Sequence, residues 1–406
     1  MKWKNRGHEY DRVYEKISQK KCFYLFGAGD YGQQFLKIFK NELDIKGFID
    51  NNSLKKGTVI HEKPCFSPDE IVLEADEGII VTMSQIARVK PVEQLRELGY
   101  IKDKDFFIIE EFLSVYHVYK NDIVYFSSVS FLPSTACNLN CRNCLNFNPF
   151  AKQFYVRQWE ELVKDVDLFF SCVDRIMLFH ISGGEPLIYK HTADLAEYID
   201  KNYGDRIDTL RMVTNGTIVP KDDVLEKLSR CRIEITVDDY REAVPHFKDR
   251  FQQLIGKLDE YHIKYYINKV DSWIDLAPER TDYSWWTEEQ LEKHRESCSQ
   301  SWQELRGGKL YSCNYAAYAT VAGMAGEQDL EEVYDLTEFT AEKKKELVEF
   351  RLGYTTKGYT NFCKKCRGFT PENIEEMEPA KQMNDLEETR YGCRDFWCRK
   401  SREILI

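Results

Sequence analysis

Three cysteines stand close together in the stretch TACNLNCRNCLNF, where Cys137, Cys141 and Cys144 follow the spacing C-x3-C-x2-C. Four thiolates complete the coordination of an iron–sulfur cluster or of a structural zinc ion, and the metal is then closed to chemistry. Three thiolates on a cubane leave one iron open to a small molecule. The alternative is a zinc site of three cysteines and one histidine, with His117 or His180 as the fourth ligand.

Repeated strand and helix patterns surround these cysteines. Helical stretches over 157–170, 191–202 and 221–230 alternate with apolar runs that predict strands. The runs are 124–131, 175–181, 209–214, 232–237 and 263–270. Such βα units predict a complete or partial α/β barrel, whose active site lies at the carboxyl ends of the strands. The cysteines directly follow the first run, at such an end.

Three further polar motifs follow strand runs, namely ISGGEP, VTNGT and ITVDDY. Paired glycines allow backbone to approach a ligand closely, and a glutamate offers an anionic acceptor to an ammonium group. Each motif alone would be an ordinary turn. The candidate ligand-binding residues in them are Gly183, Gly184, Glu185, Pro186, Thr214, Asn215, Thr236 and Asp238.

In this order and at these strand ends, the motifs resemble the radical SAM superfamily, in which the C-x3-C-x2-C loop follows the first barrel strand. The resemblance implies an α/β fold with a partial (β/α)6 barrel and a 4Fe-4S cluster held by Cys137, Cys141 and Cys144. It also implies that S-adenosylmethionine binds the free iron, with its amino group held by the segment around Glu185. The motifs that end the next two strands are then expected to line the cofactor or the substrate.

One position departs from that family pattern. Many members carry an aromatic residue just before the third cysteine, where it packs on the adenine, but this chain has Asn143. The hypothesis is that Phe147 takes over this contact.

Four more cysteines form a second group. Cys298 and Cys313 follow the pattern C-x9-G-x4-C, and FCKKC adds Cys363 and Cys366. Four thiols from two such pieces could hold zinc in a treble-clef-like site or a second iron–sulfur cluster. The spacing resembles the twitch module, a shortened SPASM extension that carries one auxiliary 4Fe-4S cluster. The full SPASM pattern would continue C-x5-C-x3-C, and this chain does not follow it.

The remaining cysteines lie outside both groups. Cys393 and Cys398 could be further ligands, a displaced second auxiliary site or plain thiols. Isolated cysteines are mostly small buried apolar residues. Two of the isolated ones, Cys172 and Cys231, are candidate hydrogen donors if the reaction is a radical epimerisation.

The motif GAGDYG near the amino terminus matches G-x-G-x-x-G between a strand run and a helical pattern. Its glycines are Gly27, Gly29 and Gly32, and Asp50 ends the next strand run. Such a turn at a helix N-terminus can receive a phosphate. The region resembles the Rossmann-type domain of sugar-nucleotide-modifying enzymes such as PglD-like acetyltransferases, which implies a nucleotide or sugar-nucleotide ligand. The alternative is a degenerate fold that kept its glycine turn for packing.

A chain of 406 residues is expected to form two or three domains. We expect a Rossmann-like domain over 1–113, a connector near 111–123, a radical SAM core over 124–285 and a twitch- or SPASM-like module over 286–406. The acidic stretch 371–390 is expected to be a solvated helix.

Composition restricts the location and the partners. A net charge of -11 argues against binding to nucleic acid or to an anionic membrane. No apolar run reaches the roughly 18 residues of a membrane-spanning helix, and the start MKWKNRGHEYDR lacks the apolar core of a signal peptide. The protein is expected to be cytoplasmic, where its thiols stay reduced.

The resemblance implies reductive cleavage of S-adenosylmethionine to a 5′-deoxyadenosyl radical, with flavodoxin or ferredoxin as electron donor. The first hypothesis is oxidation, epimerisation or dehydration of a sugar, a cyclitol or a nucleotide-linked small molecule. Net oxidation is favoured, because an auxiliary cluster could accept the second electron. A rival hypothesis is peptide or protein maturation, although the chain shows no small winged-helix domain for peptide recognition at its start. The third is a non-catalytic iron–sulfur or zinc protein.

Overall fold

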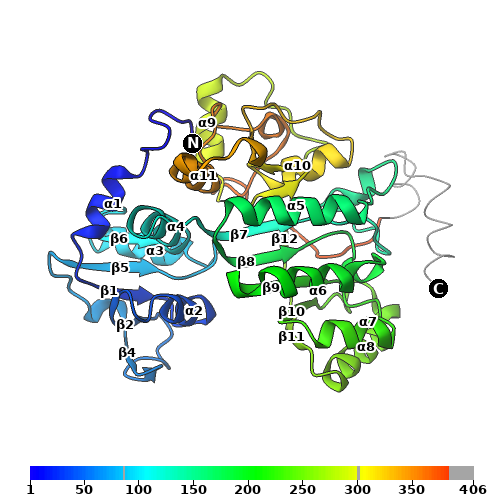
Figure 1. Cartoon of the computed structure of the whole chain (residues 1–406), viewed down its shortest axis with the longest axis horizontal. Coiled ribbons are helices and arrows are strands. Elements are labelled where there is room, and N and C mark those ends of the chain that lie inside the picture. Colours follow the sequence, from blue (N-terminus) through cyan, green and yellow to red (C-terminus); the bar gives the residue numbers. More distant parts are fainter. Residues whose placement is uncertain (86, 300–301, 384–406) are drawn as a thin grey trace. The chain divides into compact units, whose positions relative to one another are not determined.

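The structure is a computed structural model that describes residues 1–85, 87–299 and 302–383. The chain divides into two compact units (Figure 1). The amino-terminal unit consists of Lys4–Tyr125 together with Glu342–Leu352. The core unit consists of Met1–Trp3, Phe126–Ala341 and the described residues from Gly353 onward. Within the described residues no helix has the length and apolar character needed to cross a bilayer.

The amino-terminal unit is built on a six-stranded sheet in the order β3-β4-β2-β1-β5-β6. All its neighbouring strands are parallel except the hairpin of β3 and β4. The central β1 and its neighbour β5 are apolar along nearly their whole length, as expected where both faces of a parallel sheet are covered. The strands are β1 Cys22–Phe26, β2 Asp44–Ile49, β3 Val59–Ile60, β4 Lys63–Phe66, β5 Glu77–Val81 and β6 Phe106–Ile108.

The α-helices in the described residues of this unit are α1 Asp11–Ser18, α2 Asp30–Ile38, α3 Val89–Glu97, α4 Ile109–Lys120 and α11 Lys344–Arg351. The connector expected near 111–123 is wrong, because most of it forms α4, on which α1 and α11 both pack. Residues Ile109 and 112–118 of this helix are all buried. A helix that is apolar on most of its faces shows no clear 3.6-residue period, so α4 could not be recognised from the sequence.

The core unit contains an eight-stranded sheet in the order β11-β10-β9-β8-β7-β13-β14-β15. All five predicted strand runs are present, and the pairs from β8 to β11 are parallel. These strands are β7 Tyr125–Phe131, β8 Arg175–Ile181, β9 Ile207–Thr214, β10 Ile233–Asp238 and β11 Lys264–Asn268. The helices between them are α5 Trp159–Cys172, α6 Thr192–Tyr203, α7 Asp222–Ser229 and α8 Lys248–Glu260.

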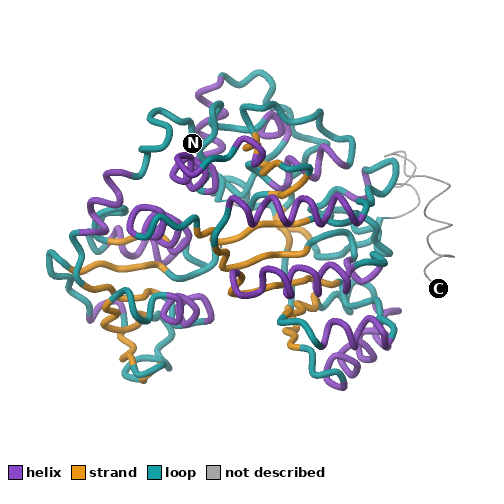
Figure 2. The backbone as a smooth tube through the Cα atoms, viewed as in Figure 1, coloured by secondary structure: helices purple, strands orange, loops and turns teal. Residues whose placement is uncertain are grey.

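The two faces of this sheet differ in polarity. In β10 the residues Ile233, Ile235 and Val237 are buried, and the alternate positions are only partly buried and polar. In β8 the ring of Phe179 packs on two phenylalanine rings of α5, so the next residue, His180, points to the opposite face. The helices therefore cover an apolar face, and the other face presents polar side chains. Figure 2 shows helices, in purple, alternating with the strands of this sheet, in orange.

The predicted carboxy-terminal module continues the same sheet. Strand β13 (Glu304–Arg306) runs parallel to β7, and β14 (Lys309–Tyr311) and β15 (Val333–Asp335) follow it antiparallel. Helices α9 (Glu288–Ser297) and α10 (Asn314–Val321) flank this hairpin in sequence. In the described residues, five strands of this sheet are joined by βα units. The sixth unit of the expected (β/α)6 barrel does not follow β11, and the next strand comes instead from a hairpin beside β7.

A two-stranded sheet joins residues far apart in the sequence. Strand β12 (Trp273–Ile274) pairs antiparallel with β16 (Glu376–Met377). The solvated helix expected over 371–390 is therefore wrong for its described part, because residues 371–383 contain a strand and no helix. Proline at two positions of this stretch, 371 and 379, disfavours a continuous helix.

Candidate active site

The three cysteines of the first motif lie together in an apolar setting after β7. Cys137, Cys141 and Cys144 pack around Leu139 and Tyr240. Burial raises the pKa of all three thiols, that of Cys141 to about 12. Metal ligands must be thiolates, so at neutral pH these side chains become thiolates only when a metal displaces their protons.

The glycine motif packs directly on the start of the cysteine loop. The backbone N–H of Gly184 donates to the carbonyl oxygen of Ser134 at 3.0 Å, and that of Glu185 donates to Ala136 at 2.7 Å. A Cβ at Gly184 would lie 2.3 Å from the carbonyl oxygen of Ala136. The group that requires this glycine is therefore the chain's own backbone, whereas the sequence interpretation assigned the close approach to a ligand.

Glu185 is 1% exposed and ties the ends of β8 and β9 together. One carboxylate oxygen, Oε1, accepts from the N–H of Leu187 at 3.0 Å and from the hydroxyl of Thr214 at 2.8 Å. The other, Oε2, accepts from the N–H of Asn215 at 2.8 Å. Burial raises the pKa of Glu185 to about 7. A carboxylate has about four acceptor positions, so about one is left for a ligand.

The motif after β9 is joined to the cysteine loop by side chains. The amide Nδ2 of Asn215 donates to Oδ1 of Asn138 at 3.1 Å and lies 3.8 Å from Sγ of Cys137. The amide of Asn138 in turn donates to the hydroxyl of Thr217 at 2.7 Å. The structure thus brings the first three predicted motifs together around Cys137.

The fourth motif ends β10. Asp238 accepts from Nδ2 of Asn268 at 2.7 Å and from the hydroxyl of Tyr240 at 2.9 Å, and burial raises its pKa. Tyr240 belongs to the apolar group that surrounds Cys141. Thr236 lies two residues earlier, on the same polar face of the strand as Asp238. The last residue of the glycine-motif set, Pro186, begins a short 3₁₀ helix and is buried.

Phe147 lies inside the protein, 2% exposed. Its ring packs on Phe362 with centroids 5.6 Å apart, in an apolar group that also contains Leu132 and Tyr318. The hypothesis that Phe147 packs on adenine therefore receives no support, because Phe362 and its neighbours already cover the ring.

The second group of cysteines comes together as well. Cys298, Cys313, Cys363 and Cys366 all line one cavity. Burial raises the pKa of the last three of these thiols, that of Cys313 to about 11. The cavity wall also contains Arg295, His294, Leu276, Tyr315, Phe362 and Phe369.

The guanidinium of Arg295 places a positive charge in the wall of this cavity. Burial acts to lower its pKa, but the four cysteine sulfurs outweigh burial and raise the pKa of the guanidinium. One of its nitrogens donates to the carbonyl oxygen of Ser312 at 3.3 Å. A fixed positive charge thus stands beside four potential thiolates.

Single-ion sites are not formed in the described part of the chain, where no three His, Cys, Asp or Glu side chains converge as ligands of one metal ion. The two histidines of the zinc alternative are used elsewhere. His117 stacks on Phe39 in the amino-terminal unit, and His180 packs on Trp302. The four cysteines of the second group line one cavity, and four thiols are a donor set that suits either zinc or a polynuclear cluster.

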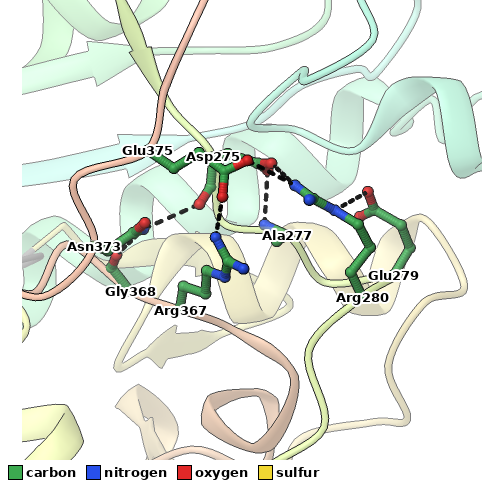
Figure 3. Close-up of polar contacts among 8 residues, drawn as sticks. All are labelled: Asp275, Ala277, Glu279, Arg280, Arg367, Gly368, Asn373 and Glu375. Carbon is green, nitrogen blue, oxygen red and sulfur yellow. Dashed lines mark hydrogen bonds and ion pairs between the residues drawn. The ribbon is translucent and has the colours of Figure 1, made fainter.

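An ionic network fastens the second cysteine group to β12 (Figure 3). Arg367, which directly follows the last of these cysteines, donates to Glu375. Arg280 pairs with Asp275 and reaches Glu375 at 3.5 Å. The amide of Asn373 donates to the carbonyl oxygens of Asp275 at 3.0 Å and of Gly368 at 2.8 Å. These contacts hold the loop that carries two of the four thiols.

Cys172 and Cys231 are poorly placed as hydrogen donors. Cys172 ends α5 and precedes β8, and Cys231 precedes β10. Both therefore lie at the amino ends of strands, whereas the motifs lie at the carboxyl ends. Their sulfurs face the carbonyl oxygens of Leu336 and Lys227 instead. Cys393 and Cys398 lie outside the described residues.

Packing explains two of the three glycines in the amino-terminal turn. A Cβ at Gly27 would lie 2.7 Å from the carbonyl oxygen of Thr82, and one at Gly32 would lie 1.9 Å from that of Gly27, so packing alone requires both. Around Gly29 a Cβ would meet nothing within 4 Å. Asp50 accepts from the N–H of Ala28 at 3.0 Å and from Lys55 at 2.9 Å, so its carboxylate is engaged within the unit.

Two residues beside the cysteine groups were not recognised from the sequence. Arg295 stands one helical turn before Cys298, a spacing that could have identified it. Gln382 donates from Nε2 to Sγ of Cys141 at 3.4 Å, and its place more than two hundred residues later gave no signal.

A parallel α/β sheet with a three-cysteine loop after its first strand, and polar motifs at the next strand ends, defines a class of enzymes. Residues 131–272 match the family model of the Radical SAM superfamily. A search of curated proteins found no match.

Several solved structures are similar in part. Streptococcus suis SuiB bound to S-adenosylmethionine is 19% identical over 45% of this chain, with a TM-score of 0.30. The chain spans 40% of the length of SuiB. BtrN in complex with AdoMet and 2-DOIA is 17% identical over 62% of this chain and 98% of its own, with a TM-score of 0.37. Native anSMEcpe with bound AdoMet and Kp18Cys peptide is 12% identical over 68% of this chain and 98% of its own, with a TM-score of 0.36.

Proposed function

We propose that this protein reductively cleaves S-adenosylmethionine at a 4Fe-4S cluster and oxidises a polar small molecule. The observation that carries the proposal is the convergence of separate strand-end motifs on the cysteine loop of the radical SAM domain. Cys137, Cys141 and Cys144 are the residues that would hold the cluster. When bound, the cluster and S-adenosylmethionine supply a radical that abstracts hydrogen from the substrate.

The side chains around this loop have defined tasks in the proposal. Glu185 has about one acceptor position left, at the end of β8, which suits the amino group of S-adenosylmethionine. Asn215 holds the loop through Asn138 and so fixes where Cys137 stands. Tyr240 and the surrounding apolar side chains exclude water from the thiolates.

The polar face of the sheet supports a hydroxylated or phosphorylated substrate, such as a sugar, a cyclitol or a sugar nucleotide. Arg211 lies 3.8 Å from Glu234 on neighbouring strands, and Lys264 pairs with Glu234 as well. In the described part of the chain, Nε of Arg211 and Nδ1 of His180 are buried and have no hydrogen-bond partner. Burial, with the nearby Arg211, lowers the pKa of His180 to about 3, so its ring is neutral. Such groups can bind substrate oxygens.

The second cysteine group favours oxidation within this proposal. Cys298, Cys313, Cys363 and Cys366 would hold an auxiliary 4Fe-4S cluster, and four thiolates leave no iron free for substrate. Conversion of an alcohol to a carbonyl releases one hydrogen atom to the radical, one proton, and one electron that such a cluster can accept. Epimerisation needs a hydrogen atom returned to the substrate, typically from a cysteine thiol, and Cys172 and Cys231 lie at the amino ends of their strands.

The decisive experiment replaces Cys137, Cys141 and Cys144 together by alanine in the full chain. The reconstituted wild type should hold about eight irons per chain, and the triple variant about half of them. The variant should form no 5′-deoxyadenosine under reducing conditions. The double variant of Cys172 and Cys231 is the matched control and should keep full activity. Undiminished cleavage in the triple variant would refute the proposal.

The substrate class is tested with the same assay. Formation of 5′-deoxyadenosine should be coupled to an oxidised sugar, cyclitol or sugar nucleotide supplied in excess. Coupling only to a peptide would reassign the enzyme to peptide maturation. Incorporation of solvent deuterium into an unoxidised substrate would replace oxidation by epimerisation.

A further inference from the structure

A segment near the end of the described chain lies against the first cysteine loop. The backbone N–H of Arg142 donates to the carbonyl oxygen of Lys381 at 2.7 Å. The N–H of Met383 donates to the carbonyl oxygen of Asn140 at 2.9 Å. Cys141 and Gln382 form the antiparallel bridge between these two bonds. Residues 380–383, here called the strap, thus pair with the loop that carries the three thiols.

The side chain of Gln382 is held at both ends of its amide. Its Oε1 accepts from the backbone N–H of Asn140 at 2.8 Å. Its Nε2 donates to the carbonyl oxygen of Ala380 at 2.6 Å and to Sγ of Cys141 at 3.4 Å. A backbone donor on one side and a backbone acceptor on the other leave one possible orientation of the amide. The N–H that faces Cys141 is therefore fixed by these two backbone contacts.

A hydrogen bond to a ligating sulfur changes the electronics of the metal group it serves. The reduced form of an iron–sulfur cluster carries one more negative charge than the oxidised form. A donor that points at a thiolate sulfur stabilises the reduced form more, and so raises the reduction potential. The same bond restricts the rotation of the cysteine side chain. The side chains of Leu139, Tyr240 and Val244 form an apolar surrounding, in which a single N–H has a stronger electrostatic effect on the sulfur than it would have in water.

We propose that Gln382 is a positioning residue that orients Cys141 as a cluster ligand and raises the reduction potential of the cluster held there. The inference rests on the proposed function, since it assumes a cluster at the first cysteine loop. The strap follows β16, whose pairing with β12 fixes its approach, and the ionic network of Asp275 and Glu375 lies beside that pairing. The part of the chain that carries the second cysteine group therefore also completes the site of the first.

Three substitutions in the full chain separate electronic from structural effects. Gln382→Leu removes both polar atoms. Gln382→Glu keeps an acceptor for Asn140 but turns a carboxylate oxygen toward Cys141 and Ala380. Lys381→Met is the matched control, because the Lys381 side chain is 54% exposed and pairs with the neighbouring Glu378, while its carbonyl bond to Arg142 is kept.

Each reconstituted protein is titrated electrochemically and followed by electron paramagnetic resonance, with and without S-adenosylmethionine. The cofactor changes the signal of the cluster that it binds, which distinguishes this cluster from an auxiliary one. The reduction potential of the responsive cluster should become more negative in Gln382→Leu and still more negative in Gln382→Glu. Lys381→Met should match the wild type.

The outcomes separate the inference from the proposed function. Equal potentials in all four proteins, with the responsive cluster present, overturn the inference alone. Loss of the responsive cluster in Gln382→Leu, with normal loading of Lys381→Met, supports the positioning role. Equal loss of the responsive cluster in Gln382→Leu and Lys381→Met overturns that role, because the strap would then act through its backbone. A wild type without any responsive cluster refutes the proposed function itself.

Discussion

Glu185→Gln should weaken both the local structure between β8 and β9 and the binding of S-adenosylmethionine. The wild-type carboxylate accepts three hydrogen bonds, from Leu187, Thr214 and Asn215. Glutamine has the same shape but only one oxygen. Its NH2 group must face a donor on at least one side, whichever way the amide is turned.

The magnitude follows from the best orientation. With the NH2 group placed at Oε2, the amide faces the N–H of Asn215, and that bond is lost while the two at Oε1 remain. Leaving a buried donor unsatisfied costs about 1–3 kcal/mol. The neutral side chain avoids the burial of charge that raises the pKa of Glu185 to about 7, which offsets part of this loss. A net loss of about 2 kcal/mol is expected at neutral pH.

Hydrogen exchange measures this loss where it arises. The chain has two compact units, so a global free energy of unfolding would mix their contributions. A loss of about 2 kcal/mol should speed the exchange of the amides of Asn215 and Leu187 by about 30-fold. Amides of β1 and β5, in the other unit, serve as the internal control and should be unchanged.

Two results would contradict this reasoning. Unchanged exchange at Asn215 would mean that its bond to Glu185 contributes nothing to local stability. Normal binding of S-adenosylmethionine by the Gln variant would mean that the fourth acceptor position does not serve the amino group. Glu185→Asp, which keeps the charge and retracts it by one methylene, should give an intermediate loss of binding.

Three further outcomes are expected. S-adenosylmethionine should bind about tenfold more weakly at pH 6 than at pH 8, because the pKa of Glu185 is raised to about 7 and only the ionised carboxylate accepts an ammonium group. The affinity of Glu185→Gln for S-adenosylmethionine should be the same at both pH values. Isothermal calorimetry measures both affinities. Arg295→Met should lower the reduction potential of the auxiliary cluster by on the order of tens of millivolts, and Lys293→Met, whose side chain is 72% exposed on the same helix, should not. Gly29→Trp should leave the fold and uncoupled cleavage of S-adenosylmethionine intact, since a Cβ there meets nothing within 4 Å, but should weaken the binding of a nucleotide or sugar nucleotide at the amino-terminal glycine turn.

The strand-end motifs could be predicted because their signal is local. An apolar run followed by glycine and a carboxylate reports the end of a parallel strand, and the five runs became β7 to β11. The spacing of Cys298, Cys313, Cys363 and Cys366 was enough to predict that they gather, and the structure places them around one cavity. The group they hold remains a prediction.

Other features depend on contacts that no short stretch contains. Helix α4 was missed because its burial on most faces removes the periodic pattern. The strap was missed because its partner residues precede it by more than two hundred positions. Phe147 looked free to meet a ligand, but the distant Phe362 covers its ring. Cys172 and Cys231 looked equivalent to any thiol until the direction of the strands placed them at the other ends.

Helix α11 has a consequence for how the protein is made. This helix, Lys344–Arg351, belongs to the amino-terminal unit, where Glu346 pairs with Arg6 and Lys344 pairs with Asp122. Its last residue, Arg351, is among the largest fully buried side chains. A ribosome that has released Tyr125 must therefore add roughly 200 residues before this unit can close, which takes on the order of 10 s or more at ordinary synthesis rates. The part of the chain that is made first is thus finished only after nearly the whole core unit has left the ribosome.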